Sequence, residues 1–386
     1  MSSLTRFDVA VIGGGVMGCA AARALALRKQ RVVLFEKAHL GHTGGSSHGR
    51  SRIIRLAYAH TAYIALSRAA YPAWERLSEE AGEPLMRITG GLDLAFAPVE
   101  SWHETARAMT AAGVPYEVLD RDEIARRFPQ FRLPEGTRAL LQPDAGVLHA
   151  DRCLHALAAA ARRAGVNLRE HEEVLSIKPL ANGVELQTPQ AAYGADRLVI
   201  AAGAATDKLL QPLGCTLPIS ASKEQVVFFR PHDPALHGPD RLPVFIFHLG
   251  GRRLASGFPL LREDGLKLMI ENKRPALDGD NAIDRALLER LKAEVRRILP
   301  GLDAQAARAE TCRYTLTPDE DFILDRHPAY PHVVIASPCS GHGFKFAPLF
   351  GEVLADLAMD GTPSIDLDLF RIDRPALRPS ARSATA

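Results

Sequence analysis

Residues 8–18 constrain the fold of this chain more than any other stretch. They read D-V-A-V-I-G-G-G-V-M-G, a short apolar strand that runs into the pattern G-x-G-x-x-G. Gly13 permits the tight turn from strand to helix, Gly15 lets the backbone approach a pyrophosphate, and Gly18 lets the helix pack closely on the sheet. The first turn of such a helix presents free N–H groups and a partial positive charge. The pattern therefore predicts a strand, a turn and a helix that bind an anion.

The residues that follow complete this unit. An Ala-rich helix through about Arg28 precedes a second apolar strand, 31–35, which ends at Glu36. An acid roughly 20 residues after the glycines accepts hydrogen bonds from ribose hydroxyls, and its charge disfavours a 2′-phosphate. Because strand, turn, helix, strand and acid occur in this order, we expect a Rossmann-like dinucleotide-binding domain. A glycine-rich turn in an ordinary α/β unit is the alternative interpretation.

Length and composition restrict the class of protein. A chain of 386 residues exceeds one ordinary core, so about two domains are expected. The net charge of +2, without a dominant basic run, argues against nucleic-acid binding. No secretory signal is visible, and apolar runs such as 156–161 and 198–205 are too short to span a membrane. Five cysteines without a C-x-x-C pair suit a reducing compartment. We expect a cytoplasmic protein with no metal site.

The order of patterns along the chain predicts a divided first domain. After a Gly/Ser/His-rich loop at 41–49 and a helix at 61–81, the alternating segments 91–96 and 139–142 indicate antiparallel strands. The α/β rhythm then returns, and a mostly β stretch with one charged helix interrupts it again. Further expected elements are helices at 153–164, 284–299 and from about 348, and strands at 166–168, 197–203 and 332–336. The expected division assigns 1–85, 146–215 and 316–375 to the dinucleotide-binding domain, 86–145 and 216–315 to a substrate domain, and 376–386 to a mobile tail.

Three further segments resemble a known family. They are 45–55 (G-S-S-H-G-R-S-R-I-I-R), 312–325 (C-R-Y-T followed by an acidic stretch) and 339–346 (C-S-G-H-G-F-K-F). Together with the glycine pattern, they resemble the monomeric sarcosine oxidase and N-methyltryptophan oxidase family of flavin amine oxidases over nearly the whole chain. The resemblance implies a mixed α/β protein: a Rossmann-like FAD-binding domain and a second, mostly antiparallel β substrate domain. It also implies a monomer.

Cys312 matches the cysteine that forms a thioether to the flavin in this family. The resemblance therefore implies FAD that is covalently attached through Cys312. A small buried hydrophobe is the other interpretation of a free cysteine. The remaining cysteines match no attachment position and are expected to be packing residues; they are Cys19, Cys153, Cys215 and Cys339.

The resemblance also implies how a substrate carboxylate is held. Arg55 matches the family's carboxylate clamp and Lys345 lies beside it, while Arg52 and His342 match residues next to the flavin. A guanidinium suits this task because its planar fork grips a carboxylate with two hydrogen bonds. Solvated charges on a loop, and a loop histidine with ordinary hydrogen bonds, are the competing interpretations.

Lys267 matches a family lysine at the flavin ring, where it acts on oxygen. A cation there helps O2 accept its first electron by stabilising superoxide, which favours an oxidase over a dehydrogenase. An exposed strand lysine is the alternative. Tyr314, another expected catalytic-site residue, is retained in the Cys-Arg-Tyr-Thr segment.

Two substitutions separate this chain from sarcosine oxidases. Glu271 replaces a histidine, and Ser256 replaces a tyrosine just before Gly-Phe-Pro. By alignment both fall in the substrate pocket. Ser256 makes room there, and a carboxylate at Glu271 favours a cationic or hydrogen-donating substrate group, although Glu271 can also point into water. We therefore expect that sarcosine itself is not the best substrate.

The resemblance predicts the residues that contact the cofactor. They are Gly13, Gly15, Val16, Met17, Gly18, Glu36, Lys37, Ser46, His48, Arg52, Gly203, Cys312, Gly341, Gly343, Phe344 and Lys345.

The implied activity is that of an FAD-dependent oxidase of secondary α-amino acids. Such an enzyme oxidises a C–N bond to an imine and reduces O2 to H2O2. Four other functions stay open. They are an oxidase of cyclic imino acids such as pipecolate, a dehydrogenase that passes electrons to a quinone or partner protein, a flavin-binding protein with a degenerate pocket, and an NAD-dependent dehydrogenase. The last leaves Cys312 and the loop 341–345 unexplained.

Overall fold

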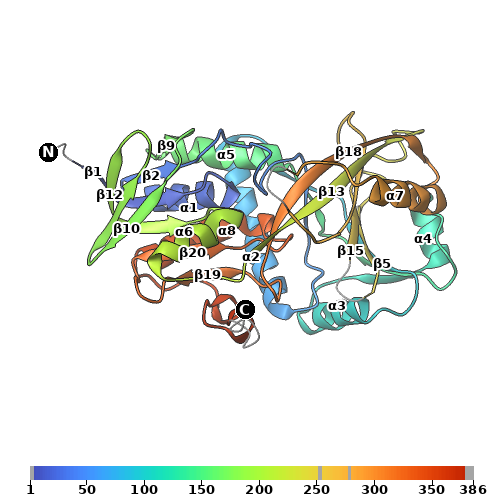
Figure 1. Ribbon diagram of the computed structural model, residues 1–386. Helices are drawn as coiled ribbons and strands as arrows, with labels where there is room; N and C mark the ends of the chain where they lie inside the picture. Colours follow the sequence, from blue (N-terminus) through green and yellow to red (C-terminus); the bar gives the residue numbers. More distant parts are fainter. Residues whose placement is uncertain (1–3, 251–253, 277–279, 379–386) are drawn as a thin grey trace, which may run out of the picture.

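A computed structural model describes residues 4–250, 254–276 and 280–378. The strands of its first large sheet lie at the left of Figure 1 and those of its second at the right, with helix α2 between them. The first sheet has eight strands. Its members are β1 (Thr5–Ile12), β2 (Val32–Phe35), β9 (Asn167–Arg169), β10 (Ser176–Leu180), β11 (Gly183–Gln187), β12 (Ala192–Ile200), β19 (Ile323–Arg326) and β20 (Val333–Ser337).

The centre of the first sheet is parallel. β1 pairs in parallel with β12 and β2, β2 with β9, and β12 with β20. Strands buried on both faces read as continuous apolar runs, which explains why 9–12, 32–35 and 333–336 were recognisable in the sequence. β10, β11 and β19 add antiparallel pairs at the edges. The expected Rossmann-like core is therefore present.

Four helices pack around one apolar cluster beside this sheet. They are α1 (Val16–Leu27), α2 (Thr61–Ala81), α5 (Ala150–Arg163) and α8 (Ala347–Ala358). α1 and α8 approach closely, because a Cβ on Gly351 would lie 2.6 Å from backbone atoms of Ala20. Small residues on both helices permit this distance. The expected bounds of α2 are confirmed, and α2 ends where Gly82 adopts φ +70°.

The second sheet has nine strands, most of them antiparallel. They are β5 (Gly91–Ala95), β6 (Glu117–Asp120), β7 (Arg138–Gln142), β13 (Ser220–Pro231), β14 (Val244–His248), β15 (Leu254–Gly257), β16 (Leu266–Ile270), β17 (Arg274–Pro275) and β18 (Leu302–Leu316). One face packs on α7 (Arg285–Ile298) and α4 (Arg121–Arg127) around an apolar cluster. A small third sheet joins β3 (Arg52–Ile54), β8 (Gly146–Leu148) and β4 (Met86–Ile88).

The register of the second sheet aligns four side chains on its other face. Asp93 pairs with Ile246, Ile246 with Ser256, and Ser256 with Met269. Neighbours in register point to the same side of a sheet, and the core residues Leu92 and Leu94 point to the opposite side. A row of mixed side chains, from Asp93 on β5 to Met269 on β16, therefore lies on the side of the sheet opposite the packed core.

Two expectations about secondary structure need correction. Segment 86–145 holds two helices that we did not predict, α3 (Glu100–Ala111) and α4. The segment assigned to a mobile tail, 376–386, begins within a short 3-10 helix, Pro375–Leu377, and Leu377 is buried. Residues 379–386 of the tail lie outside the described residues. The strands of the two large sheets divide along the segments assigned to the two domains, and that division is retained as a proposal.

The remaining short elements are α6 (Thr206–Leu210) and 3-10 turns. The turns are η1 (Gly203–Ala205), η2 (Gln211–Leu213), η3 (Phe344–Phe346), η4 (Asp368–Phe370) and η5 (Pro375–Leu377). In the part of the chain that the structure describes, no helix is long and apolar enough to cross a membrane.

Candidate active site

The glycine loop has the geometry that its sequence predicts. Gly13 adopts φ +106°, and a Cβ there would lie 2.4 Å from the carbonyl oxygen of Ala201. A Cβ on Gly18 would lie 1.8 Å from the carbonyl oxygen of Gly13. Only glycine fits either position without moving backbone. The turn therefore places the buried N-terminus of α1, at Val16 and Met17, directly after β1.

The start of α1 suits a pyrophosphate. No acidic residue lies in its first turn and no side chain caps Gly15, so the positive end of the helix is available to an anion. The N–H of Val16 donates to Ser47 Oγ at 3.0 Å, which brings the loop 41–50 over the helix end. Ser47 was not among the expected cofactor residues. Loop and helix end together form a cradle that fits the diphosphate of FAD.

Glu36 is buried at the end of β2 and closes the other side of this loop. Its carboxylate accepts from the N–H of Gly14 at 2.8 Å and of Ala38 at 2.9 Å, and lies 3.3 Å from His42 Nε2. Lys37, the next residue, is exposed. A fixed carboxylate here matches the ribose-binding acid of dinucleotide folds.

Arg52 fixes the loop that follows. Its guanidinium donates to the carbonyl oxygens of Ser46 at 3.0 Å and His48 at 2.7 Å, and it lies 5.3 Å from the ring centroid of Phe344. His48 Nδ1 lies 2.8 Å from the carbonyl oxygen of Gly45, and burial lowers the pKa of His48. Arg52 is therefore satisfied by backbone oxygens, so its charge organises the loop 45–49 against Phe344.

The loop after β20 brings a second set of glycines to the site. Gly341 adopts φ +78°, and a Cβ there would lie 2.7 Å from the ring of Tyr314. A Cβ on Gly343 would lie 1.7 Å from the carbonyl oxygen of Pro338. Gly203, which begins η1 shortly after β12, adopts φ +56°, a left-handed conformation that favours glycine. Close approaches explain glycine at 341 and 343, and backbone conformation explains it at 203.

Arg55 is paired with a buried carboxylate that the sequence did not reveal. Its guanidinium nitrogen Nη1 lies 3.1 Å from Asp93 Oδ1 and also donates to the carbonyl oxygen of Ala57. The guanidinium carbon lies 4.8 Å from the ring centroid of Tyr58. The side chain of Asp93 is 4% exposed and that of Arg55 is 13% exposed. The expected clamp is thus a buried cation whose one edge is already occupied.

Lys345 also contacts Tyr58. Its Nζ donates to Tyr58 Oη at 2.7 Å and to the carbonyl oxygen of His342 at 2.6 Å. Burial, with repulsion from Arg55 and Arg52, holds the pKa of Lys345 well below its usual value. The two expected clamp residues, Arg55 and Lys345, are therefore brought together at the ring of Tyr58. Tyr58 was missed because a lone tyrosine carries no motif.

The ring of His342 is neutral and fixed in one tautomer. Burial and the charge of Lys345 lower its pKa to about 3. His342 Nε2 lies 3.2 Å from the carbonyl oxygen of Glu320, which can only accept, so Nε2 carries the proton. Nδ1 then accepts from Tyr58 Oη at 3.4 Å. A directed chain of hydrogen bonds runs from Lys345 through Tyr58 to His342.

Ser256 and Tyr314 meet at Met269. Tyr314 Oη lies 3.1 Å from the sulfur of Met269, which is the register neighbour of Ser256. Burial raises the pKa of Tyr314, and the charges of Cys312, Glu271 and Arg52 all act on it. Ser256, which is expected in the pocket by alignment, and Tyr314, which is expected at the catalytic site, are therefore both neighbours of Met269.

Glu271 lies at the edge of this group, after β16. Burial raises the pKa of Glu271 to about 7, although Lys273, whose Nζ is 3.7 Å from the carboxylate, acts to lower it. Lys273 also pairs with Glu320 at 2.6 Å. The turn is held by buried Glu224, which accepts from the N–H groups of Asn272 and Lys273 at 2.8 and 3.0 Å. Glu271 is thus a half-buried carboxyl that titrates near neutrality.

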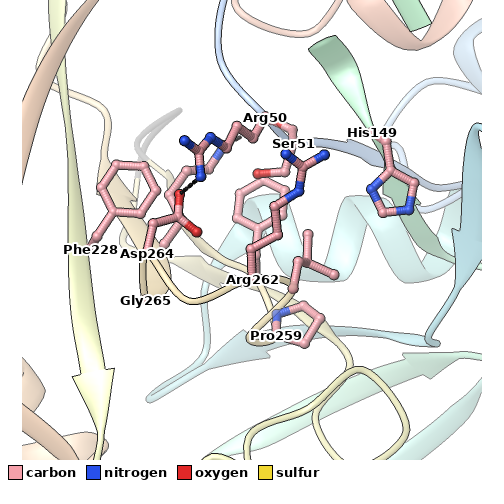
Figure 2. A pocket seen from close by; sticks show the side chains of 11 residues that line it. Arg50, Ser51, His149, Phe228, Pro259, Arg262, Asp264 and Gly265 are labelled. Carbon is pink, nitrogen blue, oxygen red and sulfur yellow. Dashed lines mark hydrogen bonds and ion pairs between the residues drawn. The ribbon is translucent and has the colours of Figure 1, made fainter. Parts of the chain in front are cut away.

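In the part of the chain that the structure describes, Lys267 is held by a backbone oxygen and an aromatic ring. Its Nζ donates to the carbonyl oxygen of Ser51 at 2.8 Å and lies 4.0 Å from the ring centroid of Phe258. Burial, with repulsion from Arg52, lowers its pKa to about 7. Lys267 lines a small cavity of about 20 Å³, which has room for one water-sized molecule. Figure 2 shows residues that line this cavity, among them Arg50, which pairs with Asp264 at 3.0 Å.

Cys312 is half-buried on β18. Its cross-strand neighbour is Glu224. Burial raises the pKa of the thiol, while the charges of Arg52 and Lys267 lower it, so both cations lie within electrostatic reach of the sulfur. Cys312 is therefore in the same part of the molecule as the expected flavin residues. Cys19 and Cys153 are fully buried, as packing residues are. Among the described residues, no cluster of ligating side chains has the makings of a metal site.

The chain is similar to known proteins over nearly its whole length. Residues 8–357 match the model of the FAD dependent oxidoreductase family. Human peroxisomal sarcosine oxidase is 37% identical over 95% of this chain and 96% of its own length. Monomeric sarcosine oxidase of Bacillus sp. (strain B-0618) is 34% identical over 99% of both chains. N-methyl-L-tryptophan oxidase of Yersinia pestis is 30% identical over 95% of this chain and 99% of its own.

The solved structures agree with this assignment. A variant of NikD, described as an unusual amino acid oxidase essential for nikkomycin biosynthesis, superimposes with a TM-score of 0.84. It is 30% identical, and the match covers 95% of this chain and 97% of that one. Given the family match over most of the chain and relatives that are similar from end to end, this protein belongs to the FAD-dependent oxidoreductase family, among sarcosine oxidases and N-methyl-L-tryptophan oxidase.

Proposed function

We propose that this protein is an FAD-dependent oxidase of secondary α-amino acids. The observation that carries the proposal is the pair of cations Arg55 and Lys345, which both contact Tyr58. Asp93 compensates Arg55, whereas burial and the charge of Arg55 penalise the ammonium of Lys345, and a bound anion would offset that penalty. An amino-acid carboxylate is such an anion, and the names of the relatives support an N-substituted amino acid.

The reaction removes a hydride equivalent from the carbon next to nitrogen. When bound, FAD supplies the acceptor for this electron pair and passes the electrons on to O2. The C–H bond breaks with its electron pair, the nitrogen loses its proton, and a C=N bond forms. The imine hydrolyses, which yields formaldehyde when an N-methyl group is oxidised. O2 takes up two electrons and two protons and becomes H2O2.

The residues of the chain bind and orient the substrate in this reaction. The free edge of Arg55 and the ammonium of Lys345 bind the carboxylate. His342 is neutral, so it adds no positive charge beside the amine. Its Nδ1 holds Tyr58 by accepting a hydrogen bond from the tyrosine hydroxyl. The amine reacts as the free base, so no general base is required. Glu271 faces the substrate group opposite the carboxylate and favours a cationic or hydrogen-donating one.

Lys267 is the residue that we propose acts on O2. A protonated amine in a buried site stabilises the negative charge that develops when O2 accepts an electron. A small cavity beside Lys267 is lined also by Arg50 and Asp264, which pair with each other. Its position supports an approach of O2 from that side.

The glycine loop, Glu36 and the loop 45–52 would hold the FAD. Cys312 is the residue we propose for covalent attachment, since it lies within electrostatic reach of Arg52 and Lys267. Acid precipitation tests this point: the flavin should stay with the wild-type protein and leave Cys312→Ser. Cys215→Ser is the matched control and should keep it.

A second candidate is an oxidase of cyclic imino acids such as pipecolate. Small Ser256, the register neighbour of Met269, leaves more room than a tyrosine and favours a bulkier ring over sarcosine. The two candidates differ in product, because a ring imine forms without formaldehyde.

We also propose that the protein is cytoplasmic and monomeric. The proposed location rests on its cysteine usage, and the proposed monomer rests on its similarity to monomeric sarcosine oxidase.

The deciding experiment mixes the holoenzyme anaerobically with sarcosine, N-methyl amino acids, pipecolate and proline, and follows the flavin absorption before air is admitted. Bleaching by one member, followed by recovery with peroxide in air, is the expected result. Bleaching that recovers only with a dye or quinone would assign a dehydrogenase. No bleaching by any member would contradict the proposal and favour a flavin-binding protein.

A further inference from the structure

Asp93 joins the carboxylate clamp to a chain of polar side chains behind it. Asp93 Oδ1, which contacts Arg55, also lies 3.1 Å from His248 Nε2. His248 Nδ1 in turn lies 3.0 Å from Ser101 Oγ. The side chains of Asp93 and His248 are both only 4% exposed. None of these three residues was singled out from the sequence, and none belongs to a motif.

The chemistry of this chain fixes its direction. An ionised carboxylate only accepts hydrogen bonds, so His248 donates to Asp93 through Nε2–H. In the neutral ring Nδ1 then accepts, and the hydroxyl of Ser101 donates to it. Asp93 is further fixed through its backbone, since its carbonyl oxygen accepts from Trp102 Nε1 at 2.8 Å. The carboxylate of Asp93 therefore has one orientation, which is fixed by His248 and by the backbone contact with Trp102.

Four separate elements meet in this chain. Ser101 lies on α3, His248 on β14 and Asp93 on β5, while Arg55 follows β3. One edge of Arg55 is held by Asp93 and the carbonyl oxygen of Ala57. The guanidinium has five N–H groups in a rigid fork, so the rest of the fork stays directed at a ligand. Without a partner on that edge, a long side chain loses this orientation.

A purely structural ion pair explains less of this arrangement. Buried ion pairs often add little net stability, because desolvation offsets the attraction. A bare pair also needs no histidine and serine behind the carboxylate. Among the other charged groups near Arg55, Lys345 repels it, whereas the carboxyl of Glu271 lies within its electrostatic reach. Asp93 is the contact that holds Arg55 in place.

We propose that Asp93, His248 and Ser101 are positioning residues that hold Arg55 in the orientation that binds a substrate carboxylate. The inference rests on the proposed role of Arg55 and deepens it, because it assigns the affinity for the carboxylate to a chain that does not touch the substrate. Asp93 acts through its hydrogen-bond geometry as well as its charge. The effect should therefore fall off along the chain from Asp93 to Ser101.

The test measures binding of cyclopentanecarboxylate, which is proline with its nitrogen replaced by carbon and has no C–N bond to oxidise. Calorimetry on the holoenzyme gives its Kd. We expect Asp93→Ala to raise Kd about 10-fold to 100-fold. Asp93→Asn keeps an acceptor for Arg55 and should stay within about threefold of wild type. His248→Ala should weaken binding less than Asp93→Ala, and His248→Gln, which retains a donor, should restore part of the affinity.

A double mutant distinguishes a chain from independent contacts. Ser101→Ala alone should raise Kd about twofold to threefold, and it should add nothing in the His248→Ala background. The matched control is His237→Ala. His237 is a buried histidine of the same domain whose Nδ1 contacts the carbonyl oxygen of Asp233. This control should leave Kd unchanged.

The outcomes separate this inference from the proposed function. An unchanged Kd in folded Asp93→Ala, or tighter binding in both Asp93 variants, overturns the positioning role. No binding to wild type overturns the clamp and the positioning chain together. If the carboxylate binds with the expected series of affinities but no secondary amine bleaches the flavin, the positioning chain is supported and the oxidase function fails. Rates of flavin reduction at saturating substrate should change less than Kd in every variant of the chain.

Discussion

The two sides of the candidate site hold their buried cations in different ways. On one side, Arg55 is paired with Asp93 and backed by His248. On the other side, Lys267 contacts a backbone carbonyl oxygen and an aromatic ring. Burial lowers the pKa of Lys267 to about 7, because these neutral partners compensate its charge only in part.

The difference indicates two tasks. A cation whose charge is balanced by a fixed carboxylate keeps its protonation state and its direction, which suits the binding of a stable anion. A cation that is poorly compensated interacts most strongly with charge that appears only during the reaction. The paired side thus suits substrate binding, and the unpaired side suits the step in which O2 becomes negatively charged.

The largest expected effect comes from removing the unpaired cation. Lys267→Met should slow reoxidation of the reduced enzyme by O2 about 10²-fold to 10³-fold, because it removes one stabilising group from the developing charge. Flavin reduction by substrate should change little. Stopped-flow measurement of each half-reaction checks this. Lys223→Met is the matched control, since Lys223 lies in the same domain and pairs with Asp280. Equal slowing of both half-reactions would reverse the assignment of the two sides.

Removal of the paired cation should affect binding instead. Arg55→Ala should raise the Kd of the amino acid about 10²-fold, the usual result of deleting one partner of a buried charge pair. Reoxidation by O2 should stay close to wild type. The carboxamide of the same substrate supplies the control, because its affinity should hardly change. An equal loss of affinity for the carboxylate and the carboxamide would mean that Arg55 does not bind the substrate carboxylate.

The pH dependence of the two sides should also differ. Lys267 is protonated below its pKa of about 7 and loses its charge above it. The rate constant for reoxidation should therefore fall as pH rises from 6 to 9, by up to about tenfold per pH unit above the pKa. Lys267→Met should remove this dependence, leaving a low, flat profile. A profile that rises with pH in wild type would show that neutral Lys267 is the active form.

Much of the cofactor-binding half could be predicted from the sequence. Glycine is required at 13, 18, 341 and 343, since a Cβ at each of these positions would collide with atoms packed against it. Such constraints are written in short motifs, so they are visible without a structure. α4 was missed although it has a capping box, Asp120 with Glu123, which is a readable signal. α3 was missed although its buried residues follow a helical period.

The partners behind the clamp could not be predicted in this way. Asp93 and Arg55 are 38 positions apart, and Asp93 and His248 are 155 apart. Their contact depends on the parallel pairing of β14 with β5, which no local pattern encodes. The one available signal is that Asp93 interrupts the apolar residues Leu92 and Leu94 of a strand, which marks the opposite face as polar. Tyr58 is likewise recognisable only from its neighbours in space.

The smallest expected effect concerns Glu271, which lies between the two sides. Its pKa of about 7 means that the carboxylate forms as pH rises through neutrality. For a substrate with an extra cationic or hydrogen-donating group, kcat/KM should rise severalfold over this range, because the carboxylate attracts that group. Glu271→Gln should remove this rise of kcat/KM with pH, and exposed Glu263→Gln should not.

Deprotonation of the amine also raises the rate with pH, but its midpoint moves with the pKa of each bound amine. The rise due to Glu271 keeps one midpoint for all substrates, so a series of amines of different pKa separates them. If every midpoint follows the amine, Glu271 points away from the substrate and the preference for donor groups must come from elsewhere in the pocket.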